Sequence, residues 1–480
     1  MAVRTGQQYI KAIQAKREVW VNGSVVDNVA TYPPFRATVE AIAALYDLQH
    51  DPAHRDVLTY GCEETGERCA RAFAPPRTVE DLVVRRQAFQ IYAESSFGML
   101  GRSPDFLNSA VMAFATAAPF FGGEGTRFHT NIQRYYRHCR ERDLFLSHAT
   151  IPPQVDRSKA ASEQADPYAY LRTSKETSDG IYVRGAKMIG TLAPLADELL
   201  VFNMPGLRPG DEPYALFFAI PISTPGVRLI CREPVNLAER SAFDSPLGTR
   251  FDEIDATCVF DDAFVPWERV FIHDNVELSN ALYDATNARH HTGHQGVVRG
   301  LAKAELLTAI AMSIAEATRS NSFLHVQEML GEILGDLELI KGAIELAENS
   351  AQVGKWGTIC PAVTPILALR YHFPKIYRRM VEIVQTLGAG GLFSLPMAND
   401  FRSPIADEVE RYHRGAGISG RDKARLMKLA WDASGSYFGQ RQLLYEQYHS
   451  GDPVRLAATQ FFQSDKPRFA EIVKRALAGI

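Results

Sequence analysis

The spacing of apolar and polar residues divides this chain of 480 residues into three regions. In the first part, apolar residues recur at helical spacing over residues 37–48, 79–99 and 106–120. Proline and glycine interrupt these runs, for example at Pro75-Pro76 and Gly122-Gly123. The pattern predicts a mainly helical domain over residues 1–150.

The spacing changes between residues 151 and 275. Short runs of β-branched and aromatic residues appear there, separated by turn residues such as Pro209-Gly210 and Ser223-Thr-Pro-Gly226. The predicted strands are residues 180–184, 198–202, 214–222, 227–230 and 256–260. Short strands broken by turns are typical of a compact β-domain.

Helical spacing returns after residue 276 and continues to the C-terminus. Seven apolar residues share one helical face: Val326, Leu330, Ile333, Leu337, Ile340, Ile344 and Ala347. Further helical runs cover residues 370–387 and 422–448. We therefore predict an α+β protein with a helical domain (1–150), a central β-barrel-like domain (151–275), and a four-helix-bundle domain with a C-terminal tail (276–480).

Composition narrows the class of protein. Apolar residues make up 46% of the chain and its net charge is -4, which argues against disorder and against a basic nucleic-acid binder. The longest apolar stretch, residues 110–121, is about half the roughly 20 residues that a membrane span needs. The N-terminus has no apolar signal-peptide core, and the six cysteines form no CxxC pair. These features predict reduced thiols and a cytoplasmic location.

The first candidate for chemistry is the segment Gly101-Arg-Ser-Pro-Asp-Phe106. A glycine before Arg102 and a proline after Ser103 favour a tight turn between two helices. Such a turn can hold the guanidinium of Arg102 in a cleft, where it stabilises an anion. The alternative is a helix start capped by Ser103 or Asp105, with Arg102 on the surface.

Histidines supply further candidates. His148 lies alone in an apolar run and can take up a proton near neutral pH; the alternative is a buried structural histidine. His290, His291 and His294 are grouped, but they lack a neighbouring acid or an HExxH pattern. We therefore favour a proton-relay or surface role there over a metal site. The glycines after Leu387 either let a cofactor approach or simply end a helix.

Several motifs together resemble one family. They are Arg4-Thr-Gly, Val19-Trp-Val, Leu45-Tyr-Asp-Leu-Gln-His50, Gly101-Arg-Ser-Pro-Asp105, Arg140-Glu-Arg-Asp-Leu144, Ser147-His-Ala149, Pro153-Gln-Val-Asp-Arg157, Gly185-Ala-Lys-Met-Ile-Gly-Thr191, Val259-Phe-Asp-Asp262, His294-Gln295, Leu387-Gly-Ala-Gly-Gly391, Arg441-Gln-Leu-Leu-Tyr-Glu446 and Gly451-Asp-Pro453. In this combination the chain resembles the oxygenase components of two-component 4-hydroxyphenylacetate 3-monooxygenases, a family that includes halophenol monooxygenases. The resemblance runs nearly end to end.

The resemblance implies a fold like acyl-CoA dehydrogenase and a homotetramer. It also implies a cofactor, FAD, that arrives reduced from a separate NAD(P)H:flavin reductase and reacts with O2 to give a C4a-hydroperoxide. The implied reaction adds oxygen ortho to the hydroxyl of a para-substituted phenol. A dry site is needed for that chemistry, together with a cation and a base beside the phenol oxygen.

The resemblance also assigns residues to roles. The catalytic candidates are Arg102, His148 and His294. The candidates for binding the phenolic substrate are Arg102, Ser103, Phe106, His148, Asn203 and Met204. Those for binding FAD are His148, Gln154, Val155, Asp156, Arg157, Thr191, His449, Ser450, Gly451 and Asp452. No metal site and no nucleic-acid or membrane partner is expected.

One position departs from the family pattern. Members that act on 4-hydroxyphenylacetate commonly have tyrosine where this chain has Phe106, so one hydrogen-bond donor is missing and the identity of the phenol stays open. A nitrophenol or halophenol monooxygenase is therefore a second interpretation of the same motifs.

Three further classes of protein are compatible with parts of the pattern. A related dehydratase that acts on 4-hydroxybutyryl-CoA would need iron–sulfur cysteines near Arg102 and His294, which the sequence lacks. An acyl-CoA dehydrogenase would need a catalytic glutamate, and the Gly-Arg-Ser-Pro-Asp turn argues against it. A helical scaffold that only binds flavin would form no product, even when reduced flavin is supplied.

Overall fold

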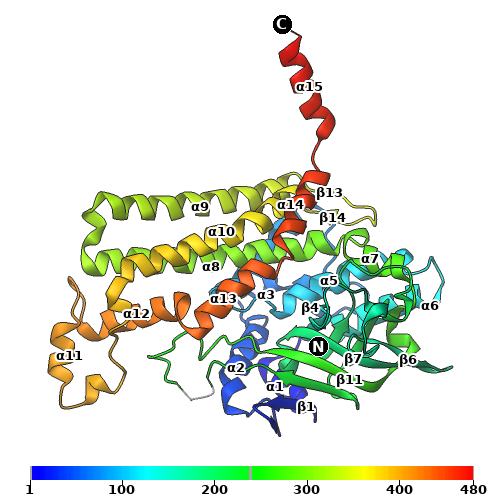
Figure 1. Ribbon diagram of the computed structural model, residues 1–480, viewed down its shortest axis with the longest axis horizontal. Helices are drawn as coiled ribbons and strands as arrows, with labels where there is room; N and C mark the ends of the chain where they lie inside the picture. Colours follow the sequence, from blue (N-terminus) through cyan, green and yellow to red (C-terminus); the bar gives the residue numbers. More distant parts are fainter. Residues whose placement is uncertain (1–2, 237–239, 479–480) are drawn as a thin grey trace.

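A computed structural model describes residues 3–236 and 240–478, and shows β-sheets flanked by helices from both ends of the chain (Figure 1). The N-terminal helices are α1 (Gly6–Ile13), α2 (Pro33–Leu48), α3 (Arg55–Leu58), α4 (Val79–Ser95), α5 (Pro104–Thr116) and α6 (Arg127–Arg142). Helix α4 ends earlier than predicted, because Phe97 and Gly98 adopt positive φ angles of 53° and 67°.

The predicted strands are present within two main sheets. The first has the order β2-β1-β10-β11-β7-β6 and the second the order β12-β9-β8-β5. The strands are β1 (Glu18–Val21), β2 (Ser24–Val25), β5 (Leu146–Ala149), β6 (Arg172–Glu176), β7 (Gly180–Thr191), β8 (Glu198–Val201), β9 (Phe217–Pro221), β10 (Val227–Cys231), β11 (Asp255–Pro266) and β12 (Val270–Ile272). Short hairpins β3 (Thr59–Gly61)–β4 (Arg68–Ala70) and β13 (Gln352–Val353)–β14 (Ile359–Cys360) lie outside these sheets.

The strands do not close into a barrel within the described residues, which corrects the barrel-like detail of the prediction. Each sheet is open and keeps two edges, and the sheets share one core, where Phe218 of β9 meets Phe260 of β11 edge to face. Strand β1 pairs in parallel with β10, and β5 pairs in parallel with β8. The first 150 residues therefore contribute strands to both sheets, and the domain boundaries stay a prediction.

The C-terminal region is helical, and its helices α8, α9 and α10 run alongside one another (Figure 1). The helices are α7 (Val276–Ala285), α8 (Ala288–Thr318), α9 (Leu324–Asn349), α10 (Val363–Gly388), α11 (Ala406–Tyr412), α12 (Gly420–Ser434), α13 (Tyr437–Tyr448), α14 (Pro453–Phe462) and α15 (Lys466–Leu477). The predicted run 422–448 is two helices, because the chain breaks at Gly435 and Ser436 caps α13. None of the helices described is both long and apolar enough to span a bilayer.

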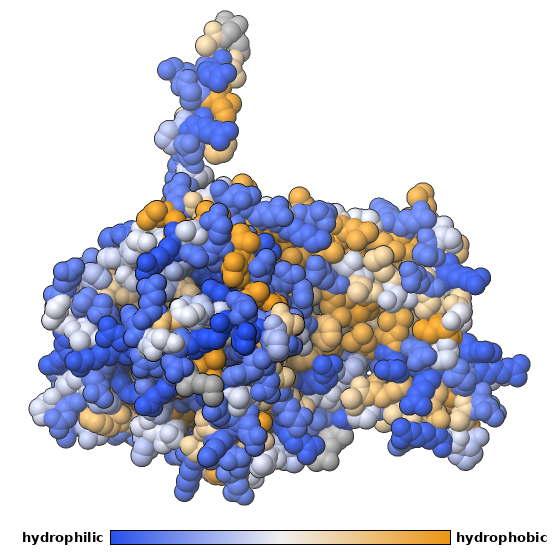
Figure 2. Space-filling view, turned by 180° about the vertical axis from the view of Figure 1, so that it is seen from behind, coloured by the Kyte–Doolittle hydropathy of each residue, from blue (hydrophilic) through white to orange (hydrophobic). Residues whose placement is uncertain are grey.

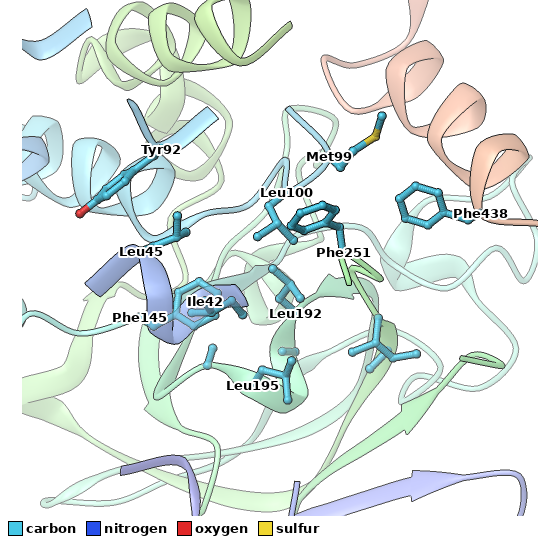
Figure 3. Packing of buried hydrophobic residues seen from close by; sticks show 14 of the residues in the cluster. Ile42, Leu45, Tyr92, Met99, Leu100, Phe145, Leu192, Leu195, Phe251 and Phe438 are labelled. Carbon is cyan, nitrogen blue, oxygen red and sulfur yellow. The ribbon is translucent and has the colours of Figure 1, made fainter. Parts of the chain in front are cut away.

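The main core lies where the helical regions meet the sheets. Figure 3 shows Leu100 beside Phe251, with Ile42 of α2 and Phe438 of α13 in the same cluster. Met99 and Leu100 are almost completely buried, so they anchor the chain just before the turn that carries Arg102. Burying these side chains fixes the backbone from which that arginine extends.

Candidate active site

A cavity of about 440 Å³ lies where the three regions of the chain meet. Its walls come from the turn before α5, from β5 and the end of β7, from α8 and α10, and from α13 with the loop that follows it. Eight of the predicted site residues line it: Arg102, Phe106, His148, Thr191, Met204, His449, Ser450 and Gly451. The volume is in the range of small-molecule and cofactor sites.

Arg102 faces this cavity rather than the solvent. Its backbone N–H donates to Glu253 at 2.8 Å, and its Nη1 donates to the hydroxyl of Tyr445 at 2.7 Å. Gly101 is required here, because a Cβ at this position would lie 2.1 Å from the Tyr445 hydroxyl oxygen. Ser103 begins α5 but makes no side-chain capping bond, so the alternative of a capped surface turn does not hold.

His148 lies on β5, which is held between two neighbours. Strand β5 pairs with β8, and Ser147 donates to the carbonyl of Thr191 at 2.7 Å. The Nδ1 of His148 is buried and has no hydrogen-bond partner among the described residues. Burial, and then the charge of Arg102, lower the pKa of His148 to about 3. The imidazole is therefore neutral at physiological pH, and its Nδ1 is available to accept a hydrogen bond.

Phe106 lies between these two groups. The guanidinium carbon of Arg102 is 4.2 Å from the centre of the Phe106 ring, and the centres of the Phe106 and His148 rings are 6.0 Å apart. The cation therefore rests on the face of an aromatic ring beside the imidazole. A tyrosine at position 106 would add a hydroxyl at the edge of the same group.

A network of ion pairs around Arg441 supports another wall of the cavity. Arg441 contacts both oxygens of Asp255 and donates to Glu253 at 2.7 Å, the same carboxylate that holds the backbone of Arg102. Burial alone would raise the pKa of Asp255, but Arg441 and Arg232 outweigh it and lower this pKa to about 2. Thr191 donates to Asp255 at 2.7 Å, so its hydroxyl has a fixed direction.

The cavity fits a bound flavin. Gly296 lines it, and a Cβ built there meets no atom within 4 Å, so the space over the backbone of α8 is open. His449 and Ser450 form the wall on the far side of Tyr445, and the rings of Tyr445 and His449 stack at 4.7 Å. The cavity thus offers an unpaired imidazole nitrogen at His148, open space over the backbone at Gly296, and positively charged arginines. A cofactor with a flat ring and anionic groups requires such features.

Three other predicted residues lie outside the cavity because their side chains have different partners. Ser103 donates to Asp105 at 2.5 Å. Asn203 accepts from Lys187 and donates to the carbonyl of Tyr214 at 2.7 Å. Asp452 caps α14 by accepting from the N–H of Arg455.

The segment from Gln154 to Arg157 also lies outside the cavity wall. Pro152 and Pro153 keep the chain extended after Ile151, so the segment leaves the site and runs along the surface. The side chain of Val155 is 62% exposed, and Asp156 accepts from Ser158. In this structure the four predicted FAD contacts there do not meet Arg102 and His148.

His294 is on the opposite face of α8 from the cavity. Its Nε2 bonds to Glu348 at 2.8 Å, and its ring packs edge to face on Phe89. His290 bonds to the carbonyl of Pro361, and His291 contacts Arg85 at 2.9 Å. The three imidazoles thus have separate partners and do not converge on one point. The helix rotates His294 away, because Gly293 and Gly296 face the cavity.

Sequence reasoning missed Tyr445, Glu253 and Arg370, all of which shape the site. Tyr445 lies within the motif Arg441-Gln-Leu-Leu-Tyr-Glu446, but its contact with Arg102, like that of Glu253, arises from long-range packing that no local pattern marks. The position of Arg370 in the sequence could have marked it as a site residue. It lies on the apolar face of α10 between Ile366 and Phe373, where a charged residue is out of place.

Open sheets between helical regions define an acyl-CoA dehydrogenase-like fold, as predicted. A solved 4-hydroxybutyryl-CoA dehydratase from N. maritimus shares it, with a TM-score of 0.89, 20% identity, and coverage of 100% of this chain and 95% of that one. Family models for the N-terminal and C-terminal parts of 4-hydroxyphenylacetate 3-hydroxylase match residues 5–272 and 279–478. The chain belongs to the 4-hydroxyphenylacetate 3-hydroxylase family.

Individual relatives agree with this assignment. The 4-hydroxyphenylacetate 3-monooxygenase oxygenase component of Thermus thermophilus is 42% identical, over 99% of this chain and 97% of that protein. The oxygenase component of 4-nitrophenol 2-monooxygenase from Rhodococcus is 33% identical, over 93% and 86%. A solved 4-hydroxyphenylacetate 3-monooxygenase oxygenase component, complexed with FAD and 4-hydroxyphenylacetate, has a TM-score of 0.95 and 42% identity, over 99% and 98%.

Proposed function

We propose that this protein is the oxygenase component of a two-component monooxygenase. It hydroxylates a para-substituted phenol such as 4-hydroxyphenylacetate at the ortho carbon, with O2 and with FAD that a separate NAD(P)H:flavin reductase has reduced. One observation carries the proposal. Arg102 and His148 face the same cavity, and among the described residues the guanidinium has no carboxylate partner and the Nδ1 of the neutral imidazole has no hydrogen-bond partner.

These two side chains act on the phenol oxygen. The charge of Arg102 stabilises the phenolate and so lowers the pKa of the bound phenol. His148 accepts the phenol proton or hydrogen bond at Nδ1. Burial and the charge of Arg102 disfavour the imidazolium, and a phenolate beside both groups would supply the missing negative charge. Electron density then moves to the ortho carbon, where oxygen is added.

Other residues hold the flavin. Thr191, His449, Ser450 and Gly451 line the part of the cavity that we assign to FAD, and Gly296 leaves its backbone open to a flat ring. When bound, reduced FAD would supply the two electrons that activate O2, and one atom of O2 would be added to the phenol while the other leaves as water. Met204 and Phe202 give an apolar wall that excludes water from this chemistry.

A panel of para-substituted phenols tests the proposal. The purified protein is supplied with FAD, NADH and a generic flavin reductase, and products are analysed by mass for the gain of one oxygen atom. 4-Hydroxyphenylacetate should gain oxygen only when the reductase is present. The panel includes 4-nitrophenol, because a nitrophenol monooxygenase is among the relatives. No product from any phenol under a sustained supply of reduced flavin would contradict the proposal.

The proposal extends to a homotetramer in the cytoplasm. Helix α15 projects from the body and buries none of its residues against its own chain, although Phe469, Ile472 and Leu477 are exposed (Figure 1). Apolar surface also gathers over the helix bundle (Figure 2). Such surfaces favour association with further copies, and the free thiols favour a reducing compartment. Light scattering of the full chain should give the mass of four copies; a monomer would contradict this.

A further inference from the structure

The arginines that face the cavity are not equally balanced by acids. Arg289 forms an ion pair with Asp284, and Arg441 pairs with Glu253 and Asp255. In contrast, Arg102 and Arg370 have no carboxylate at ion-pair distance among the residues that the structure describes. Arg102 is already assigned to the phenol oxygen. Arg370 is therefore a second surplus cation, and nothing in the proposed chemistry uses it.

The surroundings of Arg370 explain why this surplus is unusual. The residue lies on the buried face of α10, near Phe373, and its Nη2 donates to the carbonyl of Ser450 at 2.5 Å. A guanidinium has five N–H donors, and the structure gives the others no partner among the described residues. Burial, together with repulsion from Arg289 and Arg102, lowers the pKa of Arg370 to about 10, so the group still carries its charge at neutral pH.

An enclosed cation without a counter-charge destabilises an empty protein, and a ligand that brings the counter-charge removes this cost. Arg370 lines the same cavity as Arg102 and His148, and the planar guanidinium matches a ligand group with two oxygens. Building on the proposed function, we infer that Arg370 is the anion-binding residue of this cavity. It binds an oxyanion carried by a ligand, either the carboxylate on the para side chain of the phenol or a phosphate of FAD.

Binding measurements on the full-length protein separate the two sources. The variants are Arg370→Met, which keeps the aliphatic part of the side chain without its charge, and Arg370→Lys, which keeps the charge without the planar guanidinium. Affinity for FAD is followed by flavin fluorescence, and affinities for 4-hydroxyphenylacetate and the uncharged 4-ethylphenol by equilibrium dialysis. The control is Arg379→Met on the same helix, a half-exposed arginine outside the cavity that pairs with Glu332 and Glu382.

The Met variant should lose about tenfold to a hundredfold in affinity for one of the two anionic ligands, which is the size of a lost charged hydrogen bond. The Lys variant should lose less, and 4-ethylphenol should bind as it does to the wild type. If only the affinity for FAD falls, Arg370 binds a phosphate of FAD. If only the affinity for 4-hydroxyphenylacetate falls, Arg370 binds the carboxylate of the phenol. Unchanged affinity for both, or an equal loss in the Arg379→Met control, would overturn the inference.

A second readout distinguishes binding from a purely structural role. If Arg370 exists for a ligand, Arg370→Met should raise the melting temperature of the protein without ligand, since a partly buried charge without an acidic partner is removed. If Arg370 merely holds the carbonyl of Ser450, the melting temperature of Arg370→Met should fall. The affinity for 4-ethylphenol should then fall as much as the affinity for 4-hydroxyphenylacetate. That combination would also overturn the inference. None of these measurements needs turnover, so a failure to hydroxylate phenols would contradict the proposed function alone.

Discussion

At the scale of single residues, the site depends on a charge that the protein itself leaves unbalanced. The guanidinium of Arg102 is held by a neutral hydroxyl and lies over an aromatic ring, so its charge remains available to a ligand. Arg102→Ala should lower kcat/KM for the phenol by at least about a hundredfold, the size of a lost charged contact in a transition state. Steady-state kinetics measures this, with circular dichroism to confirm the fold. Turnover at the wild-type rate would remove Arg102 from the mechanism.

Phe106 gives a second prediction at this scale. Its ring lies close to both Arg102 and His148, so Phe106→Tyr adds a hydroxyl beside the position expected for the phenol oxygen of the substrate. The added donor should improve turnover of 4-hydroxyphenylacetate, by up to about tenfold for one hydrogen bond. Phe106→Leu is the control, because it removes the ring without adding a donor. An unchanged or lower kcat/KM in the tyrosine variant would mean that this position does not set the preference among phenols.

At the scale of elements, the first turn of α5 contains a buried carboxyl group, Asp105, whose ionised form is unfavourable. Asp105 is buried, and this raises its pKa to about 6 against the hydrogen bonds from Ser103 and Gln295, which lower it. Because the folded state binds the proton more tightly than the unfolded chain, the stability contributed by this group is lost as pH rises from about 4 to about 6.

Asp105→Asn should therefore stabilise the protein more at high pH than at low pH. We expect a gain in the free energy of unfolding that is about 1 kcal/mol larger at pH 8 than at pH 5. Urea denaturation at both pH values measures this, and Asp27→Asn on the exposed surface serves as the control. An equal gain at both pH values would show that Asp105 does not titrate with folding.

The elements themselves could be predicted from the sequence more fully than the site. Periodicity located α2 and α9 because each buries one face, and turn residues separated the strands. It could not place β1 beside β10, since pairing between distant strands leaves no local pattern. Motifs found Arg102 and His148. His294 was assigned to the site from its motif alone, and only the rotation of α8 shows that it faces Glu348.

At the scale of the whole molecule, we expect a separate protein to reduce the flavin. The sequence lacks a nucleotide-binding glycine fingerprint after a strand, so we expect no site for NADH. The purified protein with FAD should not oxidise NADH above the background rate, and addition of a flavin reductase should start NADH consumption. Absorbance at 340 nm follows both steps. Rapid NADH oxidation by the protein with FAD alone would contradict the two-component reaction.

The parallel pairing of β1 with β10 has a consequence for how the chain is made. While the ribosome is still synthesising the protein, β1 and β2 emerge early, but Glu18 cannot meet Arg228 until much of the chain has followed. Both sheets are complete once β12 has left the exit tunnel, before any of α8 to α13 appears. The cavity can therefore bind a ligand only after α8, α10 and α13 have been synthesised, because residues of all three helices form its walls.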